Sequence, residues 1–397
     1  MPLSLPDEIT RYFPNYAPHV VQNLLITTEG VFEAQSTNLN KVKLKLPNII
    51  RTEKPSKTSA HYKRLYRFFK DNEVHQADLM RCLVLCSLDL LGIDLSSPKG
   101  RHIRYLSLDG TSWALGTKKI HLLTLALVVG SVSIPIWWEE LDKKGLSNFE
   151  ERKRVIEGGF AIMDLDGFCL LADREYLGQA WYKYLVSKGL DFVIRLKRGI
   201  FKKHIDQQCG TKSTLFAHQS YTYRALENSA NQAKYRHSGV CKQIELLGIK
   251  YTIVVFKNPN PNAEQPLLYF ISTLKKKRKI IKAYPIRWTI ECCFKHLKSK
   301  GFDLEGIRFR KSKKIMLMMG IVVFLYSLCI RQGLLVYATS INKKWKVFKD
   351  GIRTLAVSIF RKGLENICGM FRDLRSFLYF LKQVLHTKKL TLKYNVQ

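Results

Sequence analysis

Apolar residues recur along this chain with two different spacings. Between residues 101 and 199, runs rich in β-branched and aromatic residues are separated by glycines that favour turns, which predicts three adjacent antiparallel strands. Helical patterns and short apolar runs then alternate. The predicted elements are strands at 105–108, 120–129 and 131–138, a helix at 149–161, a strand at 168–172, a helix at 179–188 and a strand at 191–195. This order is typical of an α/β fold, a mixed sheet flanked by helices.

The regions on either side of this stretch have other patterns, so we expect five parts. Residues 200–275 are rich in turns and short apolar runs, with strands predicted at 221–225, 251–256 and 267–271. Helical patterns return later, including one at 374–385. The expected parts are a helical N-terminal region (1–100), the first part of an α/β core (101–199), a β-rich insertion (200–275), the second part of the core (276–330) and a helical C-terminal region (331–397).

One almost wholly apolar segment, Ile315–Ile330, raises the question of a membrane. Its 16 residues include Gly320 and Ser327, and a spanning helix needs about 18 to 20. We therefore expect a buried core helix and no membrane partner. The N-terminus has no basic flank followed by an apolar core, which argues against secretion. The 9 cysteines form no C-x-x-C pair, so reduced and mostly buried thiols are expected.

The charge of the chain indicates a polyanionic partner. Lys and Arg together number 66 against 32 Asp and Glu, a formal net charge of +34 that is spread along the whole chain. Such a surface binds nucleic acid through release of counterions. Binding to an anionic membrane would instead be expected to use a polybasic amphipathic segment or a lipid anchor. Chemistry on nucleic acid is the favoured function.

A basic amphipathic helix is predicted near residues 57–69. Its apolar positions follow helical spacing, whereas Lys63, Arg64 and Arg67 lie outside that stripe. The apolar positions are Tyr62, Leu65, Tyr66 and Phe69. Two interpretations stay open, a helix that contacts DNA and a core helix with a solvated charged face.

Two aspartates follow short apolar runs. Asp109 precedes Gly110, which places its carboxylate at the end of the first predicted strand, although an Asp before Gly is often only a turn residue. Asp173 ends the apolar run Phe168–Ala172. Acids at strand ends of α/β sheets often build functional sites, and the alternative here is a helix N-cap.

The third acidic segment has a more specific pattern. Tyr284, Arg287, Glu291 and Lys298 are separated by 3, 4 and 7 residues, so they share one stripe of a helix that begins near Pro285. The neighbouring stripe is apolar and can pack on the sheet. The plainer alternative is an isolated ion pair between Arg287 and Glu291, worth a few tenths of a kcal/mol.

These motifs resemble those of a DDE transposase of a bacterial insertion sequence, in the insertion sequence 4 group. The signature Y-x2-R-x3-E-x6-K of that group is matched by the four residues of the helical stripe. Leu108-Asp-Gly-Thr111 resembles the first acidic motif, and Asp173-Arg-Glu-Tyr176 resembles the second. The resemblance covers roughly residues 55 to 330. It implies a ribonuclease-H-like catalytic core with a β-rich insertion before the glutamate.

The resemblance also implies roles for the matched residues. Asp109, Asp173 and Glu291 would be the catalytic residues and would ligate two Mg²⁺ or Mn²⁺ ions. Arg287 and Lys298 would grip phosphates beside the scissile bond, and Tyr284 would contact a phosphate or a base.

At the level of the whole protein, the resemblance implies a cut-and-paste transposase of the bacterial cytoplasm, associated with the nucleoid. Its N-terminal helices would bind terminal inverted repeats in double-stranded DNA, and a homodimer would cut the DNA and join it to a target. Two alternatives stay open: an inactive transposase-derived DNA-binding protein, and a nuclease with the same core that lacks strand transfer.

One departure from the better-known members concerns base stacking. They use a Trp of the insertion to hold a flipped base, and residues 200–279 contain no Trp. The candidate substitutes are Phe216, Tyr221, Tyr223 and Tyr235.

For four further residues we expect an ordinary structural position. Trp288 is expected in the core. Asp164 and Asp166 are expected in a solvated turn, with an auxiliary metal site as the alternative. His296 is expected at the surface or on a phosphate, with help in proton transfer as the alternative.

Overall fold

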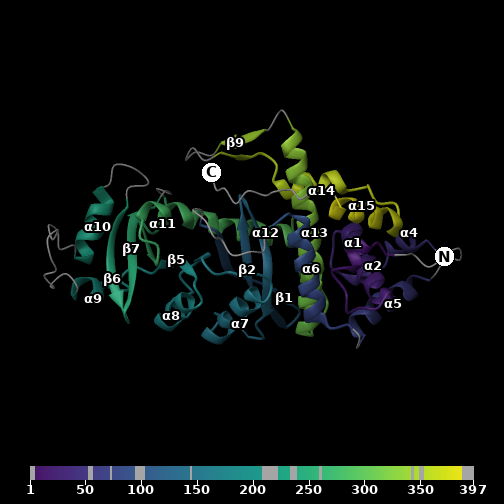
Figure 1. Ribbon diagram of the computed structural model, residues 1–397, viewed down its shortest axis with the longest axis horizontal. Coiled ribbons are helices and arrows are strands. Elements are labelled where there is room, and N and C mark those ends of the chain that lie inside the picture. Colours follow the sequence, from purple (N-terminus) through teal and green to yellow (C-terminus); the bar gives the residue numbers. More distant parts are fainter. Residues whose placement is uncertain are drawn as a thin grey trace.

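The computed structural model of the chain describes residues 5–51, 57–71, 74–93, 103–143, 145–207, 222–232, 239–258, 262–340, 344–347 and 353–386. An eight-stranded sheet runs through the middle of the molecule (Figure 1). Its strands are β1 (Tyr105–Leu115), β2 (Lys118–Val129), β3 (Val132–Glu140), β4 (Cys169–Ala172), β5 (Asp191–Leu196), β6 (Val240–Leu246), β7 (Ile249–Lys257) and β8 (Leu267–Ser272). A separate two-stranded sheet is formed by β9 (Trp345–Val347) and β10 (Arg353–Leu355).

Helices cover the sheet and also precede and follow it in the described part of the chain. Those before the sheet are α1 (Asp7–Thr10), α2 (Pro18–Ala34), α3 (Leu39–Val42), α4 (Leu46–Ile50), α5 (Thr58–Lys70) and α6 (Gln76–Leu90). Those between strands are α7 (Phe149–Phe160), α8 (Gln179–Ser187), α9 (Lys202–Gln207) and α10 (Tyr223–Gln232). Those after the sheet are α11 (Lys277–Ala283), η1 (Tyr284–Arg287), α12 (Trp288–Leu297), η2 (Leu304–Gly306), α13 (Ser312–Thr339), α14 (Ile359–Ile367) and α15 (Leu374–His386).

The strand order is β3-β2-β1-β4-β5-β8-β7-β6. The first three strands are antiparallel neighbours, and β4 and β5 run parallel to β1. This order and direction of the first five strands is the ribonuclease-H-like arrangement. The predicted fold class, a mixed sheet flanked by helices, is therefore confirmed.

The region expected as a β-rich insertion lengthens the same sheet. Strand β8 pairs antiparallel with β5, and β7 and β6 follow outward. The strand predicted at 221–225 is wrong, because α10 starts at Tyr223. Tyr223, Leu226 and Ala230 are the buried residues of α10, and their spacing is helical. The aromatic residues favour a strand, but tertiary packing determines the secondary structure of so short a segment.

Strand β1 is longer than predicted, which changes the position of Asp109. The strand pairs with β2 from Tyr105 to Leu115, so Asp109 lies within the strand and is neither at its end nor in a turn. Gly110 does not form the expected turn and has another structural role. A Cβ atom at Gly110 would lie only 2.5 Å from Nε2 of His121, so glycine permits the close approach of that side chain.

The two faces of the sheet are covered by different helices. Cys169 and Leu171 of β4 lie in one apolar cluster with residues of α11, whereas Leu170 and Ala172 lie in the main core. This alternation along the strand is the period of two expected for a strand buried on both faces. The sheet is therefore an internal layer, and its strand ends are positioned by packing on both sides.

Helix α13 is the centre of the main core. It lies beside α6 in Figure 1 and packs against α14, α2 and β3. Within the described ranges it is the one helix long and apolar enough to cross a membrane, but 83% of its most apolar window is buried inside the protein. The predicted core helix at Ile315–Ile330 is confirmed. The helix has 28 residues, so its burial and not its length supports this conclusion.

Candidate active site

Two neighbouring strands bring the two aspartates together. Strands β1 and β4 are parallel, with Leu108 opposite Ala172, so Asp109 and Asp173 are the next residues on adjacent strands. Adjacent strands lie about 4.8 Å apart. Asp173 comes directly after β4, as predicted. The N-cap alternative is wrong, since the next helix, α8, has Gly178 at its N-cap.

Glu291 comes from α12, which packs against β3 and β1. The helix follows η1 without a break, and Ile290, Cys293, Phe294 and Leu297 form its buried face. The predicted apolar stripe is therefore confirmed. Its burial fixes the rotation of α12, so that Glu291 lies at the edge of the core, beside the strands that carry the aspartates.

Arg287 joins two of these carboxylates. Its Nη1 donates to Oδ2 of Asp109 at 3.1 Å, and its Nη2 donates to Oε1 of Glu291 at 2.6 Å. The Arg287 side chain is only 12% exposed, and that of Asp109 is 17% exposed. The ion pair between Arg287 and Glu291 exists, but it is not isolated, because Asp109 shares the same guanidinium.

Asp173 is held from the other side. The hydroxyl of Tyr284 donates to its Oδ1 at 3.1 Å, and Nη1 of Arg195 lies 3.9 Å from the same oxygen. The Asp173 side chain is 31% exposed, the highest fraction of the three acids. Together, Asp109, Asp173 and Glu291 form the acidic cluster of this protein.

The electrostatics agree with this geometry. Burial raises the pKa of Asp109 to about 6; the charge of Arg287 opposes the shift, and the nearby charges of Glu175 and Glu291 add to it. Burial by itself would lower the pKa of Arg287. Tyr284 and all three members of the acidic cluster outweigh burial and raise this pKa. The guanidinium is paired with Asp109 and Glu291, its charge also interacts with that of Asp173, and it stays charged.

Lys298 lies at the opposite end of α12 from Arg287. Its Nζ donates to the carbonyl oxygen of Ser112 at 3.0 Å, pairs with Glu305 at 3.1 Å and lies 5.4 Å from the ring centre of Trp113. These contacts attach the end of α12 to β1. The four residues of the predicted stripe therefore have two different positions. Tyr284, Arg287 and Glu291 lie at the acidic cluster, whereas Lys298 attaches the helix to the strand. Its contact with phosphate stays a prediction.

The basic residues of α5 differ in their surroundings. Lys63 and Arg67 are exposed, as expected for residues outside the apolar stripe. Nε of Arg64 donates to Oδ1 of Asn23 at 2.9 Å, which attaches α5 to α2. The predicted helix is confirmed, but Tyr66 is 43% exposed, so it lies outside the buried face. DNA contact by Lys63, Arg64 and Arg67 stays a prediction.

Two aromatic residues have surroundings that differ from those expected. Trp288 is 54% exposed and not in the core, since it begins α12 on the side away from Ile290. Nζ of Lys295 lies 4.7 Å from its ring centre. His296 is half-buried and so not at the open surface, and its contact with a phosphate stays a prediction. It stacks on Phe360, and burial lowers its pKa to about 4, so it is neutral at pH 7.

The remaining candidates lie apart from the acidic cluster. Asp164 and Asp166 are exposed, and the backbone N–H of Asp166 donates to Oδ1 of Asp164 at 3.0 Å, which is the geometry of the expected turn. Tyr223 is buried and its hydroxyl accepts from the backbone of Gly199, so its ring is not open to a base. Phe216, Tyr221 and Tyr235 lie outside the described residues.

Two residues near the acidic cluster were missed. Glu175 is close enough to shift the pKa of both Asp109 and His121, and His121 approaches Gly110 from β2. Glu175 could have been predicted near the cluster, because it lies only two residues after Asp173 in the sequence. Nothing in the sequence indicates His121, because its approach to Gly110 depends on the register between β1 and β2.

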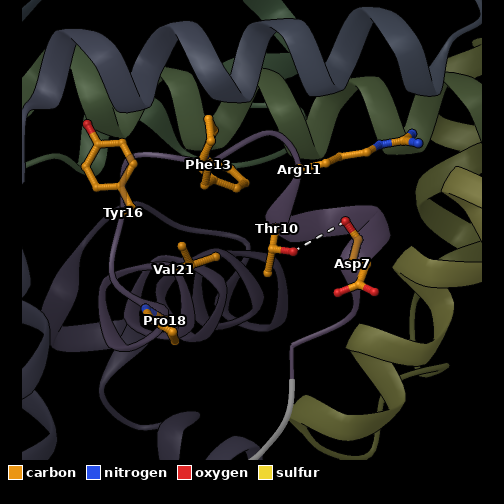
Figure 2. Close-up of a pocket in the computed structure, with 8 residues that line it drawn as sticks. Asp7, Thr10, Arg11, Phe13, Tyr16, Pro18 and Val21 are labelled. Carbon is orange, nitrogen blue, oxygen red and sulfur yellow. Dashed lines mark hydrogen bonds between the residues drawn. The ribbon is translucent and has the colours of Figure 1, made fainter.

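A surface pocket lies elsewhere. Figure 2 shows it in the N-terminal region, where Thr10 donates to the carbonyl oxygen of Asp7. Its lining contains no member of the acidic cluster. The lining residues are Asp7, Thr10, Arg11, Phe13, Pro14, Tyr16, Pro18 and Val21. The shape of this pocket gives no reason to place chemistry there.

Comparison with known proteins finds one similar family. Residues 153–328 match the family model described as the transposase DDE domain. This range includes Asp173 and Glu291 but not Asp109. The match covers less than half of the chain, and it shows that this part is similar to the DDE domain of transposases.

Two other comparisons add little to this identification. No curated protein matches the chain. One similar solved structure is the cryo-EM structure of a piggyBac transposase synaptic complex with hairpin DNA, with 9% identity, a TM-score of 0.41, and coverage of 94% of this chain and 73% of that chain. A likeness of this size is too weak to support a functional conclusion.

Transposases of this family generally use divalent metal ions, and the acidic cluster fits such an ion in its chemistry. Carboxylate oxygens are the hard ligands that Mg²⁺ and Mn²⁺ prefer. Within the described residues, no three His, Cys, Asp or Glu side chains are close enough together to hold a metal ion. Arg287 lies among the carboxylates in this arrangement. A metal site would thus need a change of side-chain conformation.

Proposed function

We propose that this protein is a transposase of the insertion sequence 4 group that binds terminal inverted repeats and performs metal-dependent cleavage and strand transfer of DNA. The observation that carries the proposal is the convergence of Asp109, Asp173 and Glu291 around one cationic side chain. Three acids, one within β1, one directly after β4 and one on α12, lie near one partly buried positive charge, and such a cluster is suited to hold cations. The transposase DDE domain supplies the reaction class.

The acidic cluster would hold two Mg²⁺ or Mn²⁺ ions. Bound there, divalent ions would activate a water or a 3′-hydroxyl as nucleophile and stabilise the leaving oxygen of a phosphodiester. The protein's own residues set the geometry. Tyr284 fixes one oxygen of Asp173, and burial of α12 fixes the position of Glu291. Arg287 has a planar donor fork that suits a phosphate beside the scissile bond.

The rest of the chain would bring DNA to this site. The formal net charge of +34 favours DNA strongly and makes binding sensitive to salt. We assign the contact with terminal inverted repeats to α5, through Lys63 and Arg67, with Arg64 holding the helix in place. A homodimer in which each copy cuts the DNA end bound by the other is part of the proposal, as is a location at the bacterial nucleoid.

Asp109→Asn tests the proposed chemistry. The change keeps the shape of the side chain but removes a charged metal ligand. The expected result in a Mg²⁺-dependent assay, with a precut inverted-repeat end from the gene's own locus and a target plasmid, is a loss of joined product of about 100-fold to 1,000-fold, as several kcal/mol of transition-state stabilisation disappear. Binding of the DNA end in a gel-shift assay should stay within about threefold of the unaltered protein, because the fold and the basic surface are unchanged.

A matched control and the alternatives can be read from the same assay. Asp164→Asn removes the same charge in an exposed turn and should leave joining unchanged. Equal loss of joining in both variants, or full joining by Asp109→Asn, would contradict the proposal. Cleavage without joining by the unaltered protein indicates a nuclease. End binding without either reaction indicates a DNA-binding protein that has lost activity.

A further inference from the structure

We infer that Arg287 is a resident counter-ion of the acidic cluster, and that a divalent cation can enter only by displacing its guanidinium from Asp109 and Glu291. The inference rests on the proposed function and deepens it, because it states how metal binding at this site is controlled. It concerns the protein before DNA arrives, when no phosphate competes for the guanidinium.

Distances show why both cations cannot be held at once. The guanidinium donates to Oδ2 of Asp109 at 3.1 Å and to Oε1 of Glu291 at 2.6 Å. Oxygens that share one Mg²⁺ lie about 2.1 Å from it, and therefore within about 4.2 Å of each other. A guanidinium bonded to both oxygens fills the space between them. Accordingly, no three acids in the described part of the chain are arranged to hold a metal ion.

Burial explains why a counter-ion is needed. The side chains of Asp109, Arg287 and Glu291 are 17%, 12% and 28% exposed. A partly buried carboxylate without a partner is destabilising. Removal of Arg287 would leave two such groups on elements far apart in the sequence, so the guanidinium stabilises both carboxylates until another cation takes its place.

Two features of Arg287 would allow its guanidinium to leave. Its Nε is buried and has no hydrogen-bond partner among the described residues, so the fork of donors is only partly used. The residue lies where η1 passes into α12, so rotation of its side chain leaves the helix and β1 in place. A displaced guanidinium suits a phosphate oxygen as a bidentate partner. DNA would thus offer Arg287 a new anion as the metal takes the carboxylates, and binding of metal and DNA would be cooperative.

Direct titration of Mn²⁺ into the full-length protein without DNA tests the inference. Arg287→Gln removes the competing cation, and the expected result in isothermal titration calorimetry is Mn²⁺ binding at least tenfold tighter than in the unaltered protein. Without metal, Arg287→Gln should unfold at a lower temperature, and Mn²⁺ should raise that temperature more than it does for the unaltered protein. Addition of an inverted-repeat DNA end should tighten Mn²⁺ binding in the unaltered protein but hardly in the variant.

Arg195→Gln is the matched control. Arg195 carries the same charge near Asp173, at 3.9 Å, but is not paired with Asp109 or Glu291. Its loss should change Mn²⁺ affinity less than about threefold, since only a longer-range Coulomb interaction disappears. If Arg287→Gln does not fold, Arg287→Lys replaces it, because an ammonium keeps the charge and cannot bridge both acids in the same way. This variant should bind Mn²⁺ with intermediate affinity.

The outcomes separate the two proposals. Equal Mn²⁺ affinity in the unaltered protein and in Arg287→Gln, with binding lost in Asp109→Asn, would overturn the counter-ion role while leaving the metal site intact. A similar gain in Arg195→Gln and Arg287→Gln would also overturn it, because general charge would then explain the effect. Mn²⁺ binding that survives Asp109→Asn would instead contradict the proposed function.

Discussion

Glu29 is a buried acid whose ionisation should control stability near neutral pH. It lies in α2 and is 1% exposed, and its Oε2 has no hydrogen-bond partner among the described residues. Burial, helped by the nearby charges of Glu33 and Asp373, raises its pKa to about 8. The perturbation we consider is Glu29→Gln, which keeps the shape of the side chain and removes the ionisable group.

The sign and size of the effect follow from the pKa. Between about pH 4.5, its ordinary value, and pH 8 the unfolded chain releases this proton while the folded protein keeps it, so stability falls as pH rises. A pKa about 3.5 above the ordinary value corresponds to about 5 kcal/mol, at 1.36 kcal/mol per pH unit. Glu29→Gln should therefore become more stable than the unaltered protein as pH rises through this window, with the largest difference above pH 8.

Urea unfolding from pH 4.5 to 8.5, followed by circular dichroism, measures this difference. Glu33→Gln is the control, because Glu33 is only half-buried on the same helix and the charge of Lys45 opposes the rise in its pKa. That control should change the pH dependence much less. Parallel stability curves for the unaltered protein and Glu29→Gln across the window would refute the reasoning, since Glu29 would then ionise normally in the folded state.

Three further predictions concern the neighbourhood of the acidic cluster. Tyr284→Phe removes the hydrogen bond to Asp173 and should lower the free energy of unfolding without DNA by roughly 1.5–3 kcal/mol, and an unchanged urea midpoint would contradict this role. Lys298→Met keeps the side-chain stem but loses the bond to the Ser112 carbonyl, so thermal unfolding should show a loss of about 1 kcal/mol. Trp288→Ala should change stability within about 0.5 kcal/mol, as expected for an exposed position. Its affinity for an inverted-repeat end in fluorescence anisotropy should nevertheless fall, because an open indole stacks on bases; unchanged affinity would exclude that contact.

The sequence predicted the order of the elements in the first part of the α/β core. Strands β2, β3 and β5 and helices α7 and α8 lie within two residues of their predicted bounds. Such agreement is possible because the period of apolar residues and the glycines at turns act locally. The same reasoning failed at α10, where tertiary packing of a short segment overrode the strand preference of its aromatic residues.

The candidate site was only partly predictable. Spacing placed Arg287 and Glu291 on one face of a helix, and the end of an apolar run placed Asp173 after a strand. Asp109 lies within β1 because the pairing of β1 with β2 continues beyond it to Leu115. The exposure of Trp288 depends on which face of α12 meets the sheet. Neither pairing nor helix rotation can be derived from neighbours in the sequence.

The sequence by itself therefore determined most of the elements around the site, the excess of positive charge and the three acids, because each depends on residue type and short-range spacing. Only the tertiary structure decided that Arg287 lies between Asp109 and Glu291 and that Lys298 fixes α12 to β1. The physical reason is that the contacts of Arg287 with Asp109 and of Lys298 with Ser112 join positions 178 and 186 residues apart. Their geometry is set by the packing of α12 on the sheet, which buries apolar side chains and thereby fixes where the polar ones point.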